Sequence, residues 1–139
     1  DLGQLEESIA IEREVYARKK ELRGPTQKST LLSGNNLVFS LVLSGQYAEA
    51  KALARKLVPT CRQALGSNHA MTLNCRAAFA QALFNDPTAP RADVLEAVAI
   101  LEDVVRAYRR VLGKHHPDTL CALAYLERAR MKREDVAAP

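Results

Sequence analysis

Apolar side chains recur every three or four residues along most of the chain, and charged side chains fill many of the positions between them. This spacing is typical of helices that bury one stripe of their surface and expose the rest. Glycine, proline and small polar residues interrupt the pattern at Gly24, Ser44–Gly45, Gly66, residues 85–90 and Gly113. The pattern therefore predicts an all-α chain. Six helices are expected, at about residues 4–22, 29–43, 46–65, 70–84, 93–112 and 117–132.

Three local signals refine these helices. Pro59 lies inside the third helix, where it removes a backbone hydrogen bond and is expected to kink the helix around residues 55–58. Asp93 and Glu96 have the spacing of a capping box at the start of the fifth helix. Pro117 is a favoured first residue for the sixth helix, because its missing N–H would have no partner there.

An eight-residue segment recurs between the helices, at residues 24–31, 66–73 and 113–120. All three copies begin with glycine and end with Thr-Leu, and the second and third share a histidine at their fourth position. The first two copies start 42 residues apart, at Gly24 and Gly66. Self-similarity with a period of about 20 to 50 residues is the signature of stacked repeats. Successive helix pairs are therefore expected to pile into an array with one continuous core.

The sixth helix carries charge where the corresponding helices are apolar, at Glu127 and Arg130. A helix with a polar outer side has no further repeat to cover it, so this helix is expected to cap the array. We expect a single helical repeat domain over residues 1–133 and a frayed tail at residues 134–139.

Composition narrows the class of protein. The 139 residues include 47% hydrophobic residues and carry a net charge of +4, which suits one domain. No apolar run reaches about 18 residues, so no membrane span is expected.

Cys61, Cys75 and Cys121 show no paired spacing, which argues against a disulfide framework or a zinc site. It favours an intracellular reducing compartment, cytoplasm or organelle interior. The chain begins with Asp1 in mid-pattern, so we expect a fragment or the ordered part of a longer protein, with any targeting segment outside it.

Candidate chemistry is sparse. His69 and His116 are repeat equivalents at successive junctions, so they are expected to order the turns rather than to share a metal with His115. Between residues 106 and 133 the chain has eight Arg or Lys against two acidic residues. This excess suits an acidic partner or nucleic acid, although a solvated helix surface is the more ordinary explanation. The sequence has no phosphate-binding loop, paired-carboxylate motif or nucleophile elbow, so we expect no enzyme, no cofactor and no metal site.

The motifs resemble the tetratricopeptide repeat (TPR), in the form found in kinesin light chains. The resemblance rests on Gly113 with His116-Pro117 and Thr119-Leu120, on Asn35-Asn36-Leu37, and on the run from Gly45 to Ala50. It implies an α–α superhelix, a TPR-like solenoid of antiparallel helices with right-handed stacking. It also implies that the first helix of each pair lines a concave side that binds a peptide or a partner protein.

This resemblance extends over nearly all of residues 3–131, with local departures. Gln27 and Lys28 stand where the first junction should have histidine and proline, Val38 is larger than the usual alanine, and Arg76 replaces an apolar residue.

The resemblance implies a set of partner-binding residues on the concave face. In the family, the asparagine that corresponds to Asn35 binds the ligand backbone; by position, Phe39 and Phe84 would supply apolar pockets and Arg128 an anchor for an acidic side chain. The alternative for Phe39, Val42 and Phe84 is a place in the core between helices. The expected binding residues are Leu32, Asn35, Phe39, Val42, Asn74, Ala77, Gln81, Phe84, Ala124 and Arg128, with Leu43, Asn85, Cys121, Met131 and Lys132 beside them.

We therefore expect a non-enzymatic protein–protein interaction scaffold or assembly subunit that binds a peptide or partner protein. As an assembly subunit, it would belong to a large complex. One alternative is an RNA-binding helical repeat. Such proteins repeat their base-contacting residues, and here Asn35, Ala77 and Ala124 do not repeat, so nucleic acid is not the expected ligand. The other alternative is a regulatory segment of a larger multidomain enzyme.

Overall fold

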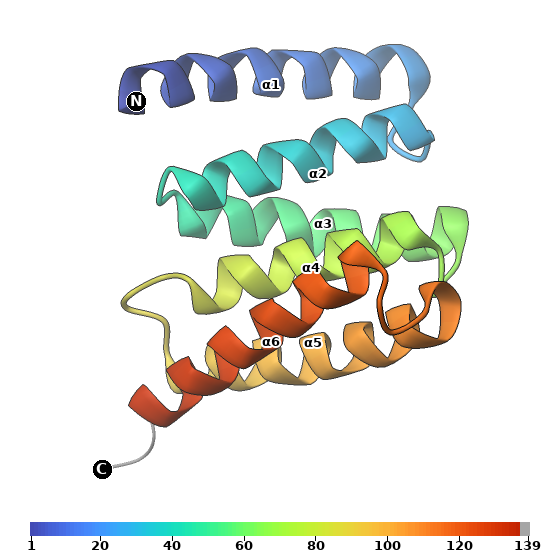
Figure 1. Ribbon diagram of the computed structural model, residues 1–139. Helices are drawn as coiled ribbons and strands as arrows, with labels where there is room; N and C mark the ends of the chain where they lie inside the picture. Colours follow the sequence, from blue (N-terminus) through green and yellow to red (C-terminus); the bar gives the residue numbers. More distant parts are fainter. Residues whose placement is uncertain (137–139) are drawn as a thin grey trace.

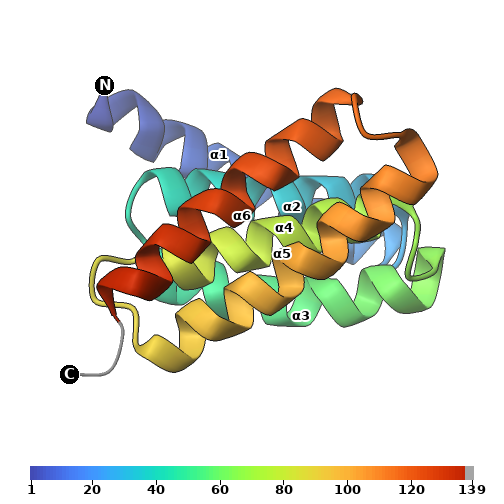
Figure 2. The same ribbon diagram turned by 60° about the horizontal axis from the view of Figure 1, so that its bottom comes forward.

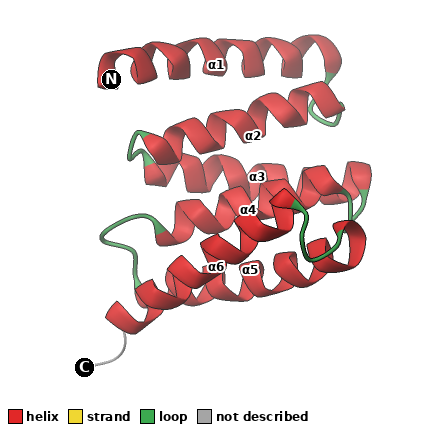
Figure 3. Cartoon of the chain, in the orientation of Figure 1, coloured by secondary structure: helices red, strands yellow, loops and turns green. Residues whose placement is uncertain are grey.

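The computed structural model describes residues 1–136, and every regular element in this range is a helix (Figure 3). The helices follow one another down the stack in chain order, with α1 at one end and α5 and α6 at the other (Figure 1). Their bounds are Leu2–Arg23 (α1), Lys28–Leu43 (α2), Tyr47–Leu65 (α3), Ala70–Phe84 (α4), Arg91–Leu112 (α5) and Pro117–Asp135 (α6). The prediction of six helices packed in sequence as a repeat stack is confirmed.

Each helix packs against its neighbours in sequence, and two further contacts organise the stack. Helix α2 packs against α4, and α4 packs against α6. In Figure 2, α6 crosses in front of α4, with α5 beside it. Helices α2, α4 and α6 therefore form a continuous layer, and this layer carries the hollows described below.

The core runs through the whole stack as one cluster, built largely of leucine, valine and alanine. Helix α1 contributes only Ile9 as a fully buried side chain, whereas α4 is buried along most of its length. Gly34 marks a point of close packing, because a Cβ atom there would lie 2.9 Å from side-chain atoms of both Leu57 and Tyr16. The first three helices can approach closely because this position has no side chain.

The repeated glycine-to-leucine segment forms a hydrogen-bonded junction. Gly66 ends α3 with a φ of 95°, a conformation that other residues rarely adopt. His69 then caps α4, because its Nδ1 accepts a hydrogen bond from the backbone N–H of Met71 at 3.0 Å. The Thr72 hydroxyl closes the turn by donating to the Gly66 carbonyl at 2.7 Å.

The third junction repeats this arrangement. Gly113 has a φ of 93°, the Nδ1 of His116 accepts from the N–H of Asp118 at 3.1 Å, and Thr119 donates to the Gly113 carbonyl at 2.8 Å. The histidines thus order the turns. Pro117 is the first residue of α6, as its sequence position predicted.

The start of α5 differs from the predicted capping box. The helix begins at Arg91 after an extended Pro90, so Asp93 lies inside the first turn and is not the cap. The Asp93 carboxylate instead pairs with Lys51 Nζ on α3 at 3.1 Å. The capping-box prediction is wrong because the helix starts two residues before Asp93, which places this residue inside the helix.

The remaining boundaries lie close to expectation. Helix α3 continues through Pro59 without interruption, and the expected kink of its axis stays a prediction. Glu134 and Asp135, which we expected in a frayed tail, belong to α6, and residues 137–139 of that tail lie outside the described residues. None of the helices in residues 1–136 combines the length and the apolar character that a membrane crossing requires.

Candidate functional site

Helices α2, α4 and α6 share a surface with three hollows, which together we call the groove. The first hollow, of about 270 Å³, lies where all three helices meet. It is lined by Leu32, Asn35, Asn36 and Phe39 of α2, Asn74 and Ala77 of α4, Tyr108 of α5, and Asp118, Cys121, Ala122 and Tyr125 of α6.

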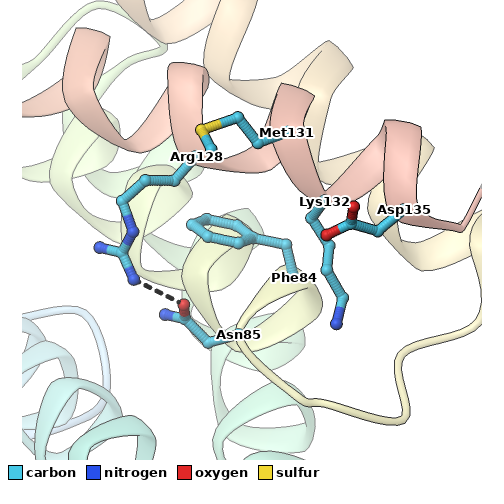
Figure 4. Close-up of a pocket in the computed structure, with 6 residues that line it drawn as sticks. All are labelled: Phe84, Asn85, Arg128, Met131, Lys132 and Asp135. Carbon is cyan, nitrogen blue, oxygen red and sulfur yellow. Dashed lines mark hydrogen bonds between the residues drawn. The ribbon is translucent and has the colours of Figure 1, made fainter.

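Two further hollows adjoin each other, because both are lined by Asn85 and Arg128. The second, of about 270 Å³, also contacts Val42, Leu43, Tyr47 and Gln81. The third, of about 280 Å³, lies between the end of α4 and the last turns of α6 (Figure 4). Its other lining residues are Phe84, Met131, Lys132 and Asp135.

Nine of the ten sequence-predicted residues line the groove, and the tenth does not. Leu32, Asn35, Phe39, Asn74 and Ala77 line the first hollow; Val42 and Gln81 line the second, Phe84 the third, and Arg128 the second and third. Ala124 is exposed on α6 but lines none of these hollows. Their role in binding stays a prediction.

The alternative role in the core applies to part of this set. Val42 and Phe84 are buried members of the core cluster, and Phe39 packs against that cluster while half-buried. Phe84 also presents part of its ring to the third hollow, where it lies beneath the Arg128 side chain (Figure 4). One residue can therefore serve both the core and the groove.

Two buried amides in the groove have unpaired polar atoms. Asn35 on α2 is only 5% exposed, and its Oδ1 has no hydrogen-bond partner in residues 1–136. Gln81 on α4 is 7% exposed, and its Nε2 likewise has no partner within that range. An unmade hydrogen bond of a buried polar group costs about 1–3 kcal/mol. A ligand that offers backbone N–H and C=O groups could recover part of this cost after a rotation of either side chain.

The third hollow has a positive rim. The Arg128 guanidinium lies 5.6 Å from the centre of the Phe84 ring, and its Nη2 donates to Asn85 Oδ1 at 3.0 Å (Figure 4). Lys132, one turn further along α6, reaches the Pro87 carbonyl at 3.5 Å. Asp135 is the one acidic residue among those that line this hollow. The two cations leave a net positive charge, which suits an acidic side chain.

The first hollow is bordered by a hydrogen bond between helices. The Tyr108 hydroxyl on α5 donates to Asn74 Oδ1 on α4. Burial raises the pKa of Tyr108, and the nearby Asp118 raises it further, so the phenol stays protonated and remains a donor. Asp118 gives this end of the groove a negative charge.

Some lining residues were missed from the sequence. Tyr108 and Asp118 both line the first hollow, but the repeat pattern did not place either of them on the concave face. The available signal for Tyr108 is chemical, because a buried tyrosine hydroxyl needs a polar partner and so points toward one. Tyr125 and Asp135 carried no comparable signal.

Two of the histidines act at the helix starts. His69 and His116 each use Nδ1 to cap a helix. Within residues 1–136, histidine, cysteine and carboxylate side chains form no group of three that could bind a metal ion.

Comparisons with known proteins point to one family. A family model described as the tetratricopeptide repeat matches residues 30–70 and 91–118. The chain is also similar to two crystal structures of the nearly identical TPR-like repeats of a candidate kinesin light chain from Podosopora anserina. Sequence identity is 27% with both, and the TM-scores are 0.74 and 0.70.

The match covers 96% of this chain, but only 60% and 61% of those two chains. The present chain thus spans about three-fifths of the length of these solved relatives. No curated protein matches the chain in sequence.

Proposed function

Since the chain is a tetratricopeptide repeat protein with repeats similar to those of kinesin light chains, and such domains are generally protein-interaction modules, we propose that its groove binds an extended peptide segment of a partner protein. The domain acts as a scaffold and performs no chemistry of its own. TPR domains are typically non-catalytic, and the groove offers hydrogen bonds, apolar contacts and charge.

The observation that carries this proposal is the pair of unpaired amide atoms of Asn35 and Gln81. They come from successive helices of the layer and line two of the groove's hollows. An extended chain presents an N–H and a C=O at each residue, which matches the donor and acceptor capacity of a carboxamide. An apolar ligand would leave these atoms unpaired.

Opposite charges at the two ends of the groove favour one orientation of a bound peptide. Asp118 lies in the first turn of α6, and Arg128 lies ten residues later on the same helix. At 1.5 Å per residue, this separation is about 15 Å along the helix axis. An extended peptide covers the same length in about four or five residues. The favoured ligand therefore carries a basic residue toward Asp118 and an acidic residue about four or five positions away, toward Arg128 and Lys132.

The first test uses a random peptide library displayed on phage, with the tightest binder resynthesised carrying a fluorophore. Asn35→Leu removes the unpaired buried oxygen, so the free protein should be as stable as the parent or more stable. The same change removes a backbone contact, so peptide affinity should fall about tenfold, which corresponds to about 1.4 kcal/mol. Thermal unfolding and fluorescence anisotropy measure the two effects separately.

Charge reversal provides the second test. Arg128→Glu should weaken binding about tenfold or more, and a peptide with lysine in place of its acidic residue should recover part of the loss. Arg18→Glu is the matched control, because Arg18 is exposed on α1, away from the groove. Unchanged affinity in both Asn35→Leu and Arg128→Glu would contradict the proposal. Mixed-sequence single-stranded RNA serves as competitor, and its displacement of the peptide would favour the nucleic-acid alternative.

A further inference from the structure

Two cysteines from neighbouring helices meet inside the core, away from the groove surface. Cys61 lies on α3 and Cys75 on α4, and their Sγ atoms are 3.0 Å apart. Both side chains are almost fully buried, with 0% and 1% of their surface exposed. The two thiols are separated by only 14 positions in sequence, across the junction that contains Gly66 and His69.

We propose that Cys61 and Cys75 form an oxidative modification site, at which hydrogen peroxide converts the two thiols into a disulfide that joins α3 to α4. The sulfur atoms need to approach by about 1 Å to reach the bonding distance of a disulfide. Both residues occupy facing positions on packed helices, so side-chain rotation with a small helix shift closes this gap. Since the thiols are held together by the fold, pairing is intramolecular and does not depend on protein concentration.

The reaction proceeds in two balanced steps. The Cys61 thiolate attacks one oxygen of hydrogen peroxide, which breaks the O–O bond and yields a sulfenic acid and hydroxide. The sulfur of Cys75 then attacks the sulfenyl sulfur, a disulfide forms, and the displaced hydroxide takes the Cys75 proton to become water. Two thiols are oxidised, one peroxide is reduced, and two waters leave.

The surroundings favour Cys61 as the first nucleophile. Its hydrogen bond with Cys75 lowers the pKa of the Cys61 thiol, whereas the same bond and burial raise the pKa of Cys75. Burial of the two thiols also favours a small oxidant. Hydrogen peroxide is close to water in size, so local opening of the fold is enough to admit it, whereas bulky disulfide reagents need an exposed sulfur.

Cys121 offers a comparison within the same chain. It is exposed on α6 and lines the first hollow of the groove. A bulky thiol reagent should therefore modify Cys121 in the folded protein and leave Cys61 and Cys75 unmodified. In denaturant, all three thiols should react.

The experiment uses a Cys121→Ser variant, in which Cys61 and Cys75 are the remaining thiols. Hydrogen peroxide treatment should lower its intact mass by about 2 Da, the mass of two hydrogen atoms. Trypsin should then release peptides 57–62 and 63–76 as one linked species that dithiothreitol separates. The linked protein should unfold at a temperature about 5 °C or more higher than the reduced form, because the bond restricts the unfolded chain.

Cys61→Ala and Cys75→Ala in the same background should lose the mass change and the linked peptide. If either variant fails to fold, the peptide map of the Cys121→Ser protein decides the question alone. A gain of oxygen mass at the two cysteines, or thiols that persist under peroxide concentrations that oxidise Cys121 in the unmodified chain, would overturn the proposal. Peptide binding in the groove is measured separately, so neither result bears on the proposed function.

Discussion

The first junction of the stack and the two later ones share a backbone path but differ in hydrogen bonding. Gly24 has a φ of 87°, close to the 95° of Gly66 and the 93° of Gly113. At Gly66 and Gly113, a histidine caps the next helix and a threonine bonds the glycine carbonyl. At the first junction, Gln27 makes no side-chain capping bond and the Thr30 hydroxyl, although fully buried, has no partner in residues 1–136.

This difference shows that the shape of the turn and its stability have separate causes. Glycine and the packing of the flanking helices are enough to set the path of the chain, since the first junction follows the same path without the histidine. The histidine cap and the threonine bond add stability to a turn that already has its shape. The first junction should therefore be the least stable of the three.

The helices that follow the junctions differ at one further equivalent position, four residues after the threonine. Gly34 occupies it on α2, Arg76 on α4 and Leu123 on α6. On α2, Leu57 and Tyr16 fill the space that a side chain would need. On α4, Arg76 reaches Asp103 of α5 at 2.6 Å. The repeats are thus alike in backbone and individually adjusted in packing.

The largest effect on stability is expected when Gly34 of α2 is replaced by leucine, the residue at the equivalent position of α6. Gly34→Leu places a leucine against Leu57 and Tyr16, and overpacking of this kind typically costs about 1–3 kcal/mol. Urea unfolding should show this loss as a lower midpoint. Asn36→Leu, at an exposed position of the same helix, is the control and should leave the midpoint nearly unchanged. Equal midpoints for the two variants would mean that the first three helices do not pack as closely as described.

The threonines should show the junction difference with a smaller effect. Thr72→Val removes the bond to the Gly66 carbonyl and should cost about 1 kcal/mol. Thr30→Val removes a hydroxyl that has no partner and should be neutral or stabilising, because the volume is kept and an unpaired polar atom is lost. Thermal unfolding of both variants measures the contrast. If Thr30→Val is as destabilising as Thr72→Val, the first junction has a hydrogen bond after all.

The smallest effect is expected from the ion pair at Arg76. The hydrogen bond from Arg76 holds the pKa of Asp103 below its ordinary value, so the pair stabilises the fold above the unfolded pKa of aspartate and loses this contribution as pH falls through the lowered pKa. The Asp103 side chain is half-exposed, so the gain at neutral pH should be below about 1 kcal/mol. Asp103→Asn should unfold at a slightly lower temperature than the parent at pH 7. The difference should shrink as pH falls below about 4. A difference that stays constant with pH would assign the effect to something other than the carboxylate charge.

The helices could be predicted from the sequence because periodicity and helix-ending glycines are local signals. The start of α6 at Pro117 followed from the residue itself, and the turn-ordering role of His69 followed from its repeat position. The role of the Asp93 carboxylate was missed, because its partner Lys51 lies 42 residues earlier in the chain. No local pattern contains such a contact.

The outline of the groove could be predicted because equivalent residues of successive repeats lie on the same surface. Repeat register placed Asn35, Gln81 and Arg128 on one surface, and all three residues line the hollows. Tyr108 was missed because it reaches this surface from α5, a helix that the repeat pattern assigns to the other side. The meeting of Cys61 with Cys75 depends on how α3 and α4 are rotated against each other, which spacing along the chain does not specify.

A crystal structure of the chain with the selected peptide would show directly where and how the peptide binds. We expect an extended peptide along α2, α4 and α6, with its backbone within hydrogen-bonding distance of the Asn35 and Gln81 side chains and an acidic residue at Arg128. A peptide bound to α1, α3 or α5, or one that leaves both amides unpaired, would contradict this expectation.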